Sequence, residues 1–172
     1  MVRFAVLVAA FGLFVPLVAG EEKFTSKDGK FSAIYPKAPK EFSTPDADVK
    51  PADGRYKYFS ASHELSKDVA YMVMYHDYLP GKLGGDPQLV LERVRNGWRG
   101  SEGRVLEDRE LSLGADKVPG RAFTVKHGDN MFRVRAFLKD LRLYQVIVTG
   151  KTREDITAET ADKFLNSFEI AK

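Results

Sequence analysis

The sequence contains no cysteine among its 172 residues. This absence excludes disulfide bridges, thiol nucleophiles and thiolate metal sites. Leu17-Val18-Ala19-Gly20 is similar to the start of a lipoprotein box, but Glu21 follows it where the lipid-bearing cysteine would stand. Lipid attachment by this route is therefore also excluded. A small domain without disulfides must be stabilised by its hydrophobic core.

A large excess of one charge is also lacking. The chain has 27 Lys and Arg against 24 Asp and Glu, and Arg3 is the only charged residue of the first twenty. The remainder therefore carries 26 positive and 24 negative side chains, a net charge of +2. Because this balance gives no strong field for a polyanion, we expect no nucleic-acid partner.

Motifs that identify common enzyme classes are missing. The sequence has no G-x-S-x-G elbow, no phosphate-binding G-x-x-x-x-G-K-[ST], no G-x-G-x-x-G and no H-E-x-x-H. The glycine-rich stretch Gly81–Gly85 precedes a predicted helix, but it lacks the rest of any phosphate motif and is interpreted as a connector. We therefore predict no catalysis, no cofactor and no metal.

The first twenty residues have the three-part layout of a secretory signal peptide. A basic head ending at Arg3 precedes the apolar run Phe4–Val18 and the small residues Ala19-Gly20. We expect cleavage after Gly20 or Ala19. After Gly20 it leaves one domain of 152 residues, 21–172, with no further membrane span. An exported protein, periplasmic or secreted, is expected; the alternative is an uncleaved N-terminal anchor.

Two β-hairpins are predicted in the first half of this domain. Lys23–Ser26 and Phe31–Tyr35 flank an Asp-Gly pair, which is typical of a hairpin turn. Arg55–Glu64 and Val69–Leu79 form the second hairpin, in which Glu64 is expected to pair with Val69. The intervening Pro36–Gly54 contains four prolines and is expected to follow an edge or the surface.

Residues 121–149 give the strongest evidence for a sheet. A two-residue turn at Gly128-Asp129 makes apolar partners coincide on one face, and a loop at Lys139–Arg142 continues that face through a third strand. Arg104–Leu113 is a fourth strand. The expected facing pairs are Val125 with Phe132, Phe123 with Val134, Val134 with Ile147 and Leu138 with Leu143.

Two amphipathic helices complete the pattern. Asp86 caps the first helix, Pro87 begins it and Gly100 ends it. The second runs from Thr152 or Thr157 to Phe168, and a short extended tail follows. The inward residues are Leu91, Val94, Trp98, Ile156, Ala161, Phe164, Leu165 and Phe168. The predicted class is α+β, an antiparallel sheet covered by helices in a three-layer α/β/α sandwich.

Histidines and their neighbours offer no predicted catalytic or metal centre. The expected register separates His63 from His76 by about 20 Å along the hairpin, so they do not share an ion. His76 and Asp77 leave opposite faces of a strand and cannot form a base and its orienting carboxylate. His127 lies beside a turn, where an exposed polar residue is the ordinary structural interpretation.

A binding surface is the remaining functional candidate. Aromatic residues on the second hairpin are suited either to an interface or to a core. A basic helix face, formed by Arg93, Arg95 and Arg99, can meet an acidic partner or simply be solvated. The candidate binding residues are His76, Tyr78, Arg95, Trp98 and Arg99. Arg133 and Arg135 lie on a strand face that is expected to point outward.

Three phrases give the chain a family resemblance. The opening FTSKDGKFSAIYPKAP and the closing RLYQVIVTG and ADKFLNSFEI resemble the first hairpin, penultimate strand and last helix of PsbP-like and DcrB-like domains. The resemblance implies an antiparallel sheet with helices on both sides, in small exported proteins that mostly bind or assist other proteins. It transfers no functional residue to this chain.

Together these features predict a monomeric, exported and non-catalytic accessory or binding domain. Its expected partner is a protein or a cell-envelope component. The alternative is a small-ligand or metal-binding module that uses the polar groups near His76 and Tyr78, and a hydrolase ranks last.

Overall fold

The computed structural model describes residues 20–43, 59–81 and 83–171. The predicted signal peptide, apart from Gly20, and most of the predicted loop Pro36–Gly54 lie outside these residues. No helix in the described part is both long enough and apolar enough to span a bilayer.

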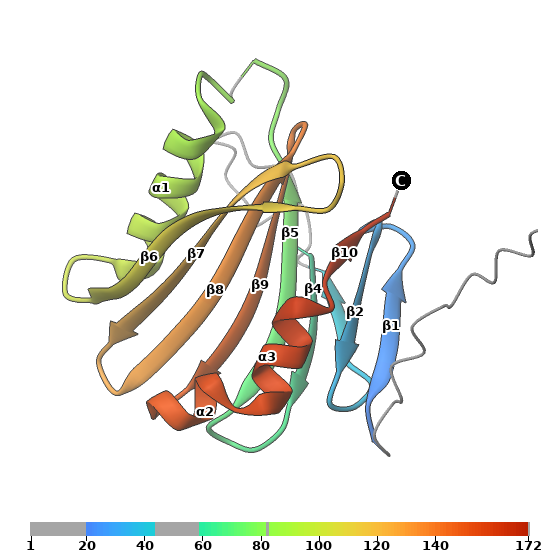
Figure 1. Ribbon diagram of the computed structural model, residues 1–172, viewed down its shortest axis with the longest axis vertical. Helices are drawn as coiled ribbons and strands as arrows, with labels where there is room; N and C mark the ends of the chain where they lie inside the picture. The colour runs from blue at the N-terminus through green and yellow to red at the C-terminus, as the bar shows by residue number, and fades with distance from the viewer. Residues whose placement is uncertain (1–19, 44–58, 82, 172) are drawn as a thin grey trace, which may run out of the picture.

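A seven-stranded antiparallel sheet forms the centre of the domain (Figure 1). Its spatial order is β3-β4-β5-β9-β8-β7-β6, in which β6 to β9 are the predicted four-strand meander. The strands are β3 (Lys40–Ser43), β4 (Phe59–Glu64), β5 (Ala70–Asp77), β6 (Arg104–Leu113), β7 (Val118–His127), β8 (Asn130–Lys139) and β9 (Arg142–Gly150). Strand β3 was not predicted from the sequence, but it lies at the edge of the sheet, as expected for part of Pro36–Gly54, and prolines near an edge strand are tolerated.

The register predicted for the meander is confirmed. Val125 faces Phe132 and Phe123 faces Val134 between β7 and β8, and the predicted pairs between β8 and β9 are also present. Gly128 has φ +60°, a conformation that glycine adopts without steric cost, so the tight turn can form. The turn therefore sets the alternation of buried and outward side chains along both strands.

The register predicted for the β4-β5 hairpin is wrong by one residue. Glu64 pairs with Ala70 instead of Val69. The backbone amides of Leu65 and Ser66 both donate to the Val69 carbonyl, and Ser66 Oγ accepts from the Val69 amide. These bonds hold Val69 in the loop and remove it from the ladder. The predicted strand residues 55–58 lie outside the described part of the chain.

A smaller sheet contains the first hairpin and the C-terminal tail. It has the order β1-β2-β10, with β1 (Glu22–Ser26), β2 (Phe31–Tyr35) and β10 (Glu169–Ile170), so the predicted hairpin and extended tail are both confirmed. The hydroxyl of Tyr144 on β9 donates to the Gly29 carbonyl over 2.9 Å. The Phe31 ring lies 6.1 Å from that of Tyr75 on β5. These contacts join the small sheet to one face of the large one.

Helix α1 (Pro87–Arg99) covers part of the opposite face. The Asp86 carboxylate accepts a hydrogen bond from the Gln88 amide over 2.9 Å, and Gly100 is the C-cap, as predicted. Its side chains Val90 and Leu91 are buried. The helix packs mainly on β7 and β8.

The closing helix is two helices, contrary to the prediction of one. α2 (Arg153–Thr157) and α3 (Glu159–Asn166) are separated at Ala158, whose backbone is extended. Thr152 and Asp155 form a capping box at the start of α2. The five apolar residues predicted to face inward are nevertheless all buried.

Arg133 and Arg135 do not face outward, so that prediction is wrong. Arg133 donates to Asp162 over 2.7 Å, and Arg135 donates to the Leu165 carbonyl over 2.9 Å at the end of α3. Burial and the neighbouring Arg133 lower the pKa of the Arg135 guanidinium. Both side chains therefore bind the closing helices to the sheet.

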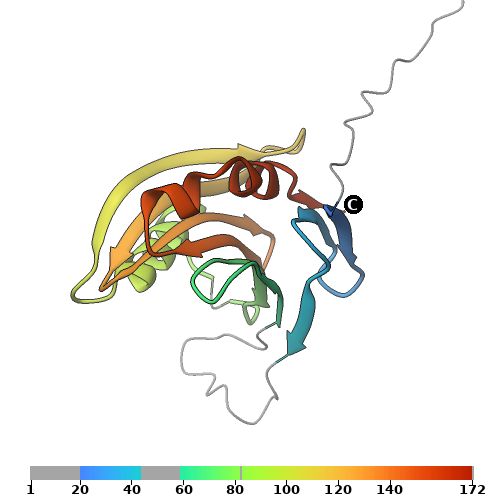
Figure 2. The ribbon, with the colours of Figure 1, turned by 90° about the horizontal axis from the view of Figure 1, so that it is seen from below.

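Hydrophobic clusters lie on both faces of the large sheet. α1 covers one cluster, whereas α2, α3 and the small sheet cover the other (Figure 2). The α+β class with an antiparallel sheet and helices is confirmed. The second face differs from a purely helical layer because strands β1, β2 and β10 share it.

Candidate functional site

A cleft lies between α1 and the strands β5 and β9. Because α1 packs on β7 and β8, it leaves the neighbouring strands of this face without a helix above them (Figure 1). The cavity volume is about 720 Å³, within the roughly 300–1,000 Å³ of ligand pockets. Its walls include Met74, His76, Tyr78, Leu83, Val90, Arg93, Val94, Gly97, Trp98, His127, Phe132, Leu143 and Gln145.

Gly97 lines the cleft from the last turn of α1. A Cβ added there would meet no atom of the described residues within 4 Å, apart from the helix's own nearby backbone. Glycine inside a helix destabilises it by about 0.5–1 kcal/mol relative to alanine. No close packing requires the glycine, and its missing side chain widens the cleft.

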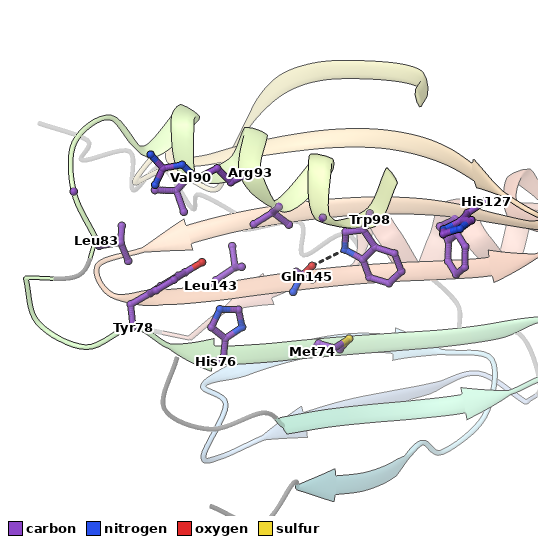
Figure 3. Close-up of a pocket in the computed structure, with 14 residues that line it drawn as sticks. Met74, His76, Tyr78, Leu83, Val90, Arg93, Trp98, His127, Leu143 and Gln145 are labelled. Atoms are coloured by element: carbon purple, nitrogen blue, oxygen red, sulfur yellow. Dashed lines mark hydrogen bonds between the residues drawn. The ribbon is translucent and has the colours of Figure 1, made fainter. Parts of the chain in front are cut away.

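Trp98 and Gln145 form a hydrogen-bonded pair across the cleft. The indole Nε1 donates to Gln145 Oε1 over 2.7 Å, and the Trp98 ring centroid lies 5.1 Å from that of Phe132. An indole nitrogen can only donate, so the Gln145 oxygen must face it and the amide nitrogen must point elsewhere. Figure 3 shows that nitrogen turned away from Trp98, on the side where His76 lies.

His76 and Tyr78 come from the end of β5 and the residue just after it. Their ring centroids are 5.0 Å apart, and His76 is buried. Both rings point into the cleft in Figure 3. Asp77 lies on the other face and binds Arg142 through two hydrogen bonds of 2.5 and 2.7 Å. The predicted separation of His76 and Asp77 is therefore confirmed.

The arginines of α1 have different surroundings. Arg93 lines the cleft, and within the described residues it has no ion pair or hydrogen bond. Arg95 instead binds Asp108 on β6. Arg99 does not line the cleft and donates to the Gly100 carbonyl over 3.2 Å. Of the five candidate residues, His76, Tyr78 and Trp98 line the cleft, whereas Arg95 and Arg99 do not.

A metal site receives no support from the described residues. They contain no group of three or more histidine and acidic side chains that could hold an ion. His63 pairs with Tyr71, whose side chain belongs to the core under α2 and α3. His63 and His76 therefore project from opposite faces of the sheet. His127 lines the cleft and is exposed, as expected beside its turn.

Gly97, Gln145 and Arg93 line the cleft but were not among the site candidates predicted from the sequence. Gly97 had a detectable signal, since an isolated glycine within a helical pattern often has a packing or functional reason. Gln145 is a polar residue within an apolar strand and is only 4% exposed. Arg93 belonged to the predicted basic helix face, but the sequence did not show which arginine of that face lines the cleft.

One solved structure decides the fold. The solution structure of cyanobacterial PsbP (CyanoP) from Synechocystis sp. PCC 6803 is similar over 95% of this chain and 98% of its own, with a TM-score of 0.56 and 15% identity. The fold is PsbP-like. At 15% identity, the similarity of the PsbP-like chain to CyanoP shows the fold alone. The predicted resemblance to DcrB-like domains stays a prediction.

Other comparisons add no functional information. A crystal structure of PA94 from Pseudomonas aeruginosa, described as a protein of unknown function and putative regulator, matches 80% of the PsbP-like chain and 87% of its own. Its identity is 9% and its TM-score 0.41. No family model matches the sequence, and no match is found among curated proteins.

Proposed function

We propose that this PsbP-like protein is an exported, non-catalytic binding domain that holds a small ligand in the cleft between α1 and the sheet. The open space at Gly97 is the observation that supports this most directly. A glycine that weakens the helix and fills no tight contact is explained if the space beside it accommodates a ligand. An accessory role toward a protein or envelope component remains compatible with this ligand.

The cleft favours a small molecule over the other candidates from the sequence. Its walls combine apolar side chains with a few polar groups, which is the usual composition of a ligand pocket. The exposed large apolar side chains among the described residues are Leu65, Leu89, Leu106 and Leu141. They come from different connections and elements and do not identify a protein-binding surface.

The remaining expectations accompany this proposal. We infer export from the N-terminal pattern of residues 1–20 and a monomeric state. We also infer that the domain is a variant of the three-layer α/β/α sandwich, in which a small sheet joins α2 and α3 in one outer layer.

A neutral fluorescent dye tests the cleft. We expect N-phenylnaphthylamine to bind the purified protein with one dye per chain and with quenching of Trp98, the only tryptophan. Gly97→Leu fills the open space and should abolish this binding. Asn96→Leu adds the same side chain at an exposed position outside the lining and should leave binding unchanged. Equal binding by all three proteins would disprove the assignment of the cleft.

A further inference from the structure

The described lining of the cleft contains one permanently charged side chain, and it is a cation. This residue is Arg93, and no described aspartate or glutamate belongs to the lining. The other arginines of α1 do not line the cleft, and Arg95 binds a carboxylate of β6. Arg93 is exposed and has no carboxylate partner in the described chain. It is therefore available to a negatively charged group of a ligand.

A second polar group of the cleft can donate a hydrogen bond to a ligand. Gln145 is 4% exposed, and its oxygen is engaged by the Trp98 indole. Within the described residues no acceptor is bound to its amide nitrogen, which faces the cleft (Figure 3). An amide nitrogen is a hydrogen-bond donor and takes an acceptor as its partner. A ligand with an oxygen at this depth would supply one.

The rest of the lining is apolar and partly aromatic. Trp98 and Phe132 form a tilted ring pair at one end, and Met74 lies on β5 below them (Figure 3). Arg93 precedes Trp98 by five residues, which is a rise of about 7.5 Å along the helix. Both residues line the cleft, at different places along it (Figure 3), so one molecule could contact the cation with one end and the aromatic pair with the other.

The geometry points to an amphipathic organic acid as the ligand, with its apolar body against Trp98 and its carboxylate or similar oxyanion at Arg93. This inference rests on the proposed function. The oxyanion accepts hydrogen bonds from the guanidinium, and an oxygen of the body accepts from Gln145. The absence of acidic side chains from the described lining avoids repulsion of this group.

A matched pair of dyes tests the charge. Anilinonaphthalene sulfonate carries an anionic group that neutral N-phenylnaphthylamine lacks. Arg93→Gln should weaken the anionic dye about tenfold, the effect of losing one charge-assisted hydrogen bond, and leave the neutral dye unchanged. Arg99→Gln removes a cation outside the lining and should change neither affinity.

The outcomes separate the two proposals. If wild-type protein binds neither dye in the cleft, the proposed function fails. If the neutral dye binds and Arg93→Gln changes both affinities equally, or changes neither, the organic-acid inference is overturned while the cleft remains a binding site. A selective loss of the anionic dye supports the inference.

Competition then distinguishes the sources of such an acid. Naphthoate represents aromatic acids and decanoate represents acyl chains, with naphthalenemethanol and decanol as their uncharged counterparts. Displacement of the anionic dye by either acid, and more weakly by its alcohol, supports the inference. The acid that displaces the dye shows whether the apolar part of the ligand is aromatic or an acyl chain. Displacement by the alcohols as strongly as by the acids contradicts it.

Discussion

Replacing Gly97 by alanine is expected to stabilise the protein. The residue lies within α1, its φ is not positive, and an added Cβ meets no described side chain or neighbouring strand within 4 Å. The native helix should therefore accept the methyl group without movement. Since the methyl group faces open space, the gain comes from helix propensity, about 0.5–1 kcal/mol.

Thermal and urea denaturation measure this gain. For a domain of this size the gain corresponds to a rise in Tm of about 1–4 °C, with an unchanged urea m-value. Gly114→Ala is a suitable control, because Gly114 also has open space around its Cβ but has φ +67°. It should be destabilised by the unfavourable backbone conformation. A loss of stability in Gly97→Ala would show that the space is filled and would refute the reasoning.

Two further substitutions test the core and an ion pair. Phe164 is fully buried, 4.8 Å from the Tyr35 ring, so Phe164→Ala should cost about 3–5 kcal/mol in urea unfolding; a cost below 1 kcal/mol would contradict the packing. The Arg121 guanidinium lowers the pKa of the Asp108 carboxyl. The Asp108 carboxylate therefore stabilises the fold fully above the unfolded-state pKa of about 3.9. This stabilisation is lost as the pH falls through the folded-state pKa. Asp108→Asn should thus be less stable than wild type near neutral pH and converge with it below about pH 4; a constant difference down to pH 2 would exclude this origin.

The parts of the fold that were predictable are those with strong local constraints. The Gly128-Asp129 turn allows one register that buries matching apolar residues, and the structure has that register. The β4-β5 hairpin has a longer loop, and its register depends on how Ser66 binds backbone amides. Periodicity does not contain that information. The break at Ala158 likewise preserves the buried face of the closing helices, so the apolar pattern cannot reveal it.

Prediction of the site was limited for the same reason, because the site depends on contacts between residues far apart in the sequence. Trp98 was identifiable from helical spacing, whereas Gln145 became relevant only when β9 was placed opposite α1. Arg93 and Arg95 are two residues apart and point about 200° apart around a helix. Their roles depend on which side of α1 meets the sheet and on the position of Asp108, 13 residues further along the chain.

The ion pairs of α1 hold the helix to the sheet on the side away from the cleft. Asp108 binds Arg121 through two hydrogen bonds of 2.7 and 2.8 Å and also binds Arg95, while Glu92 of α1 lies 3.6 Å from Arg121. These contacts fasten α1 to β6 and β7 on the side away from the cleft. The carboxylates of Glu92 and Asp108 are engaged in these contacts, and Arg93 has no carboxylate partner among the described residues. A helix held from its far side can keep its other side separated from β5 and β9.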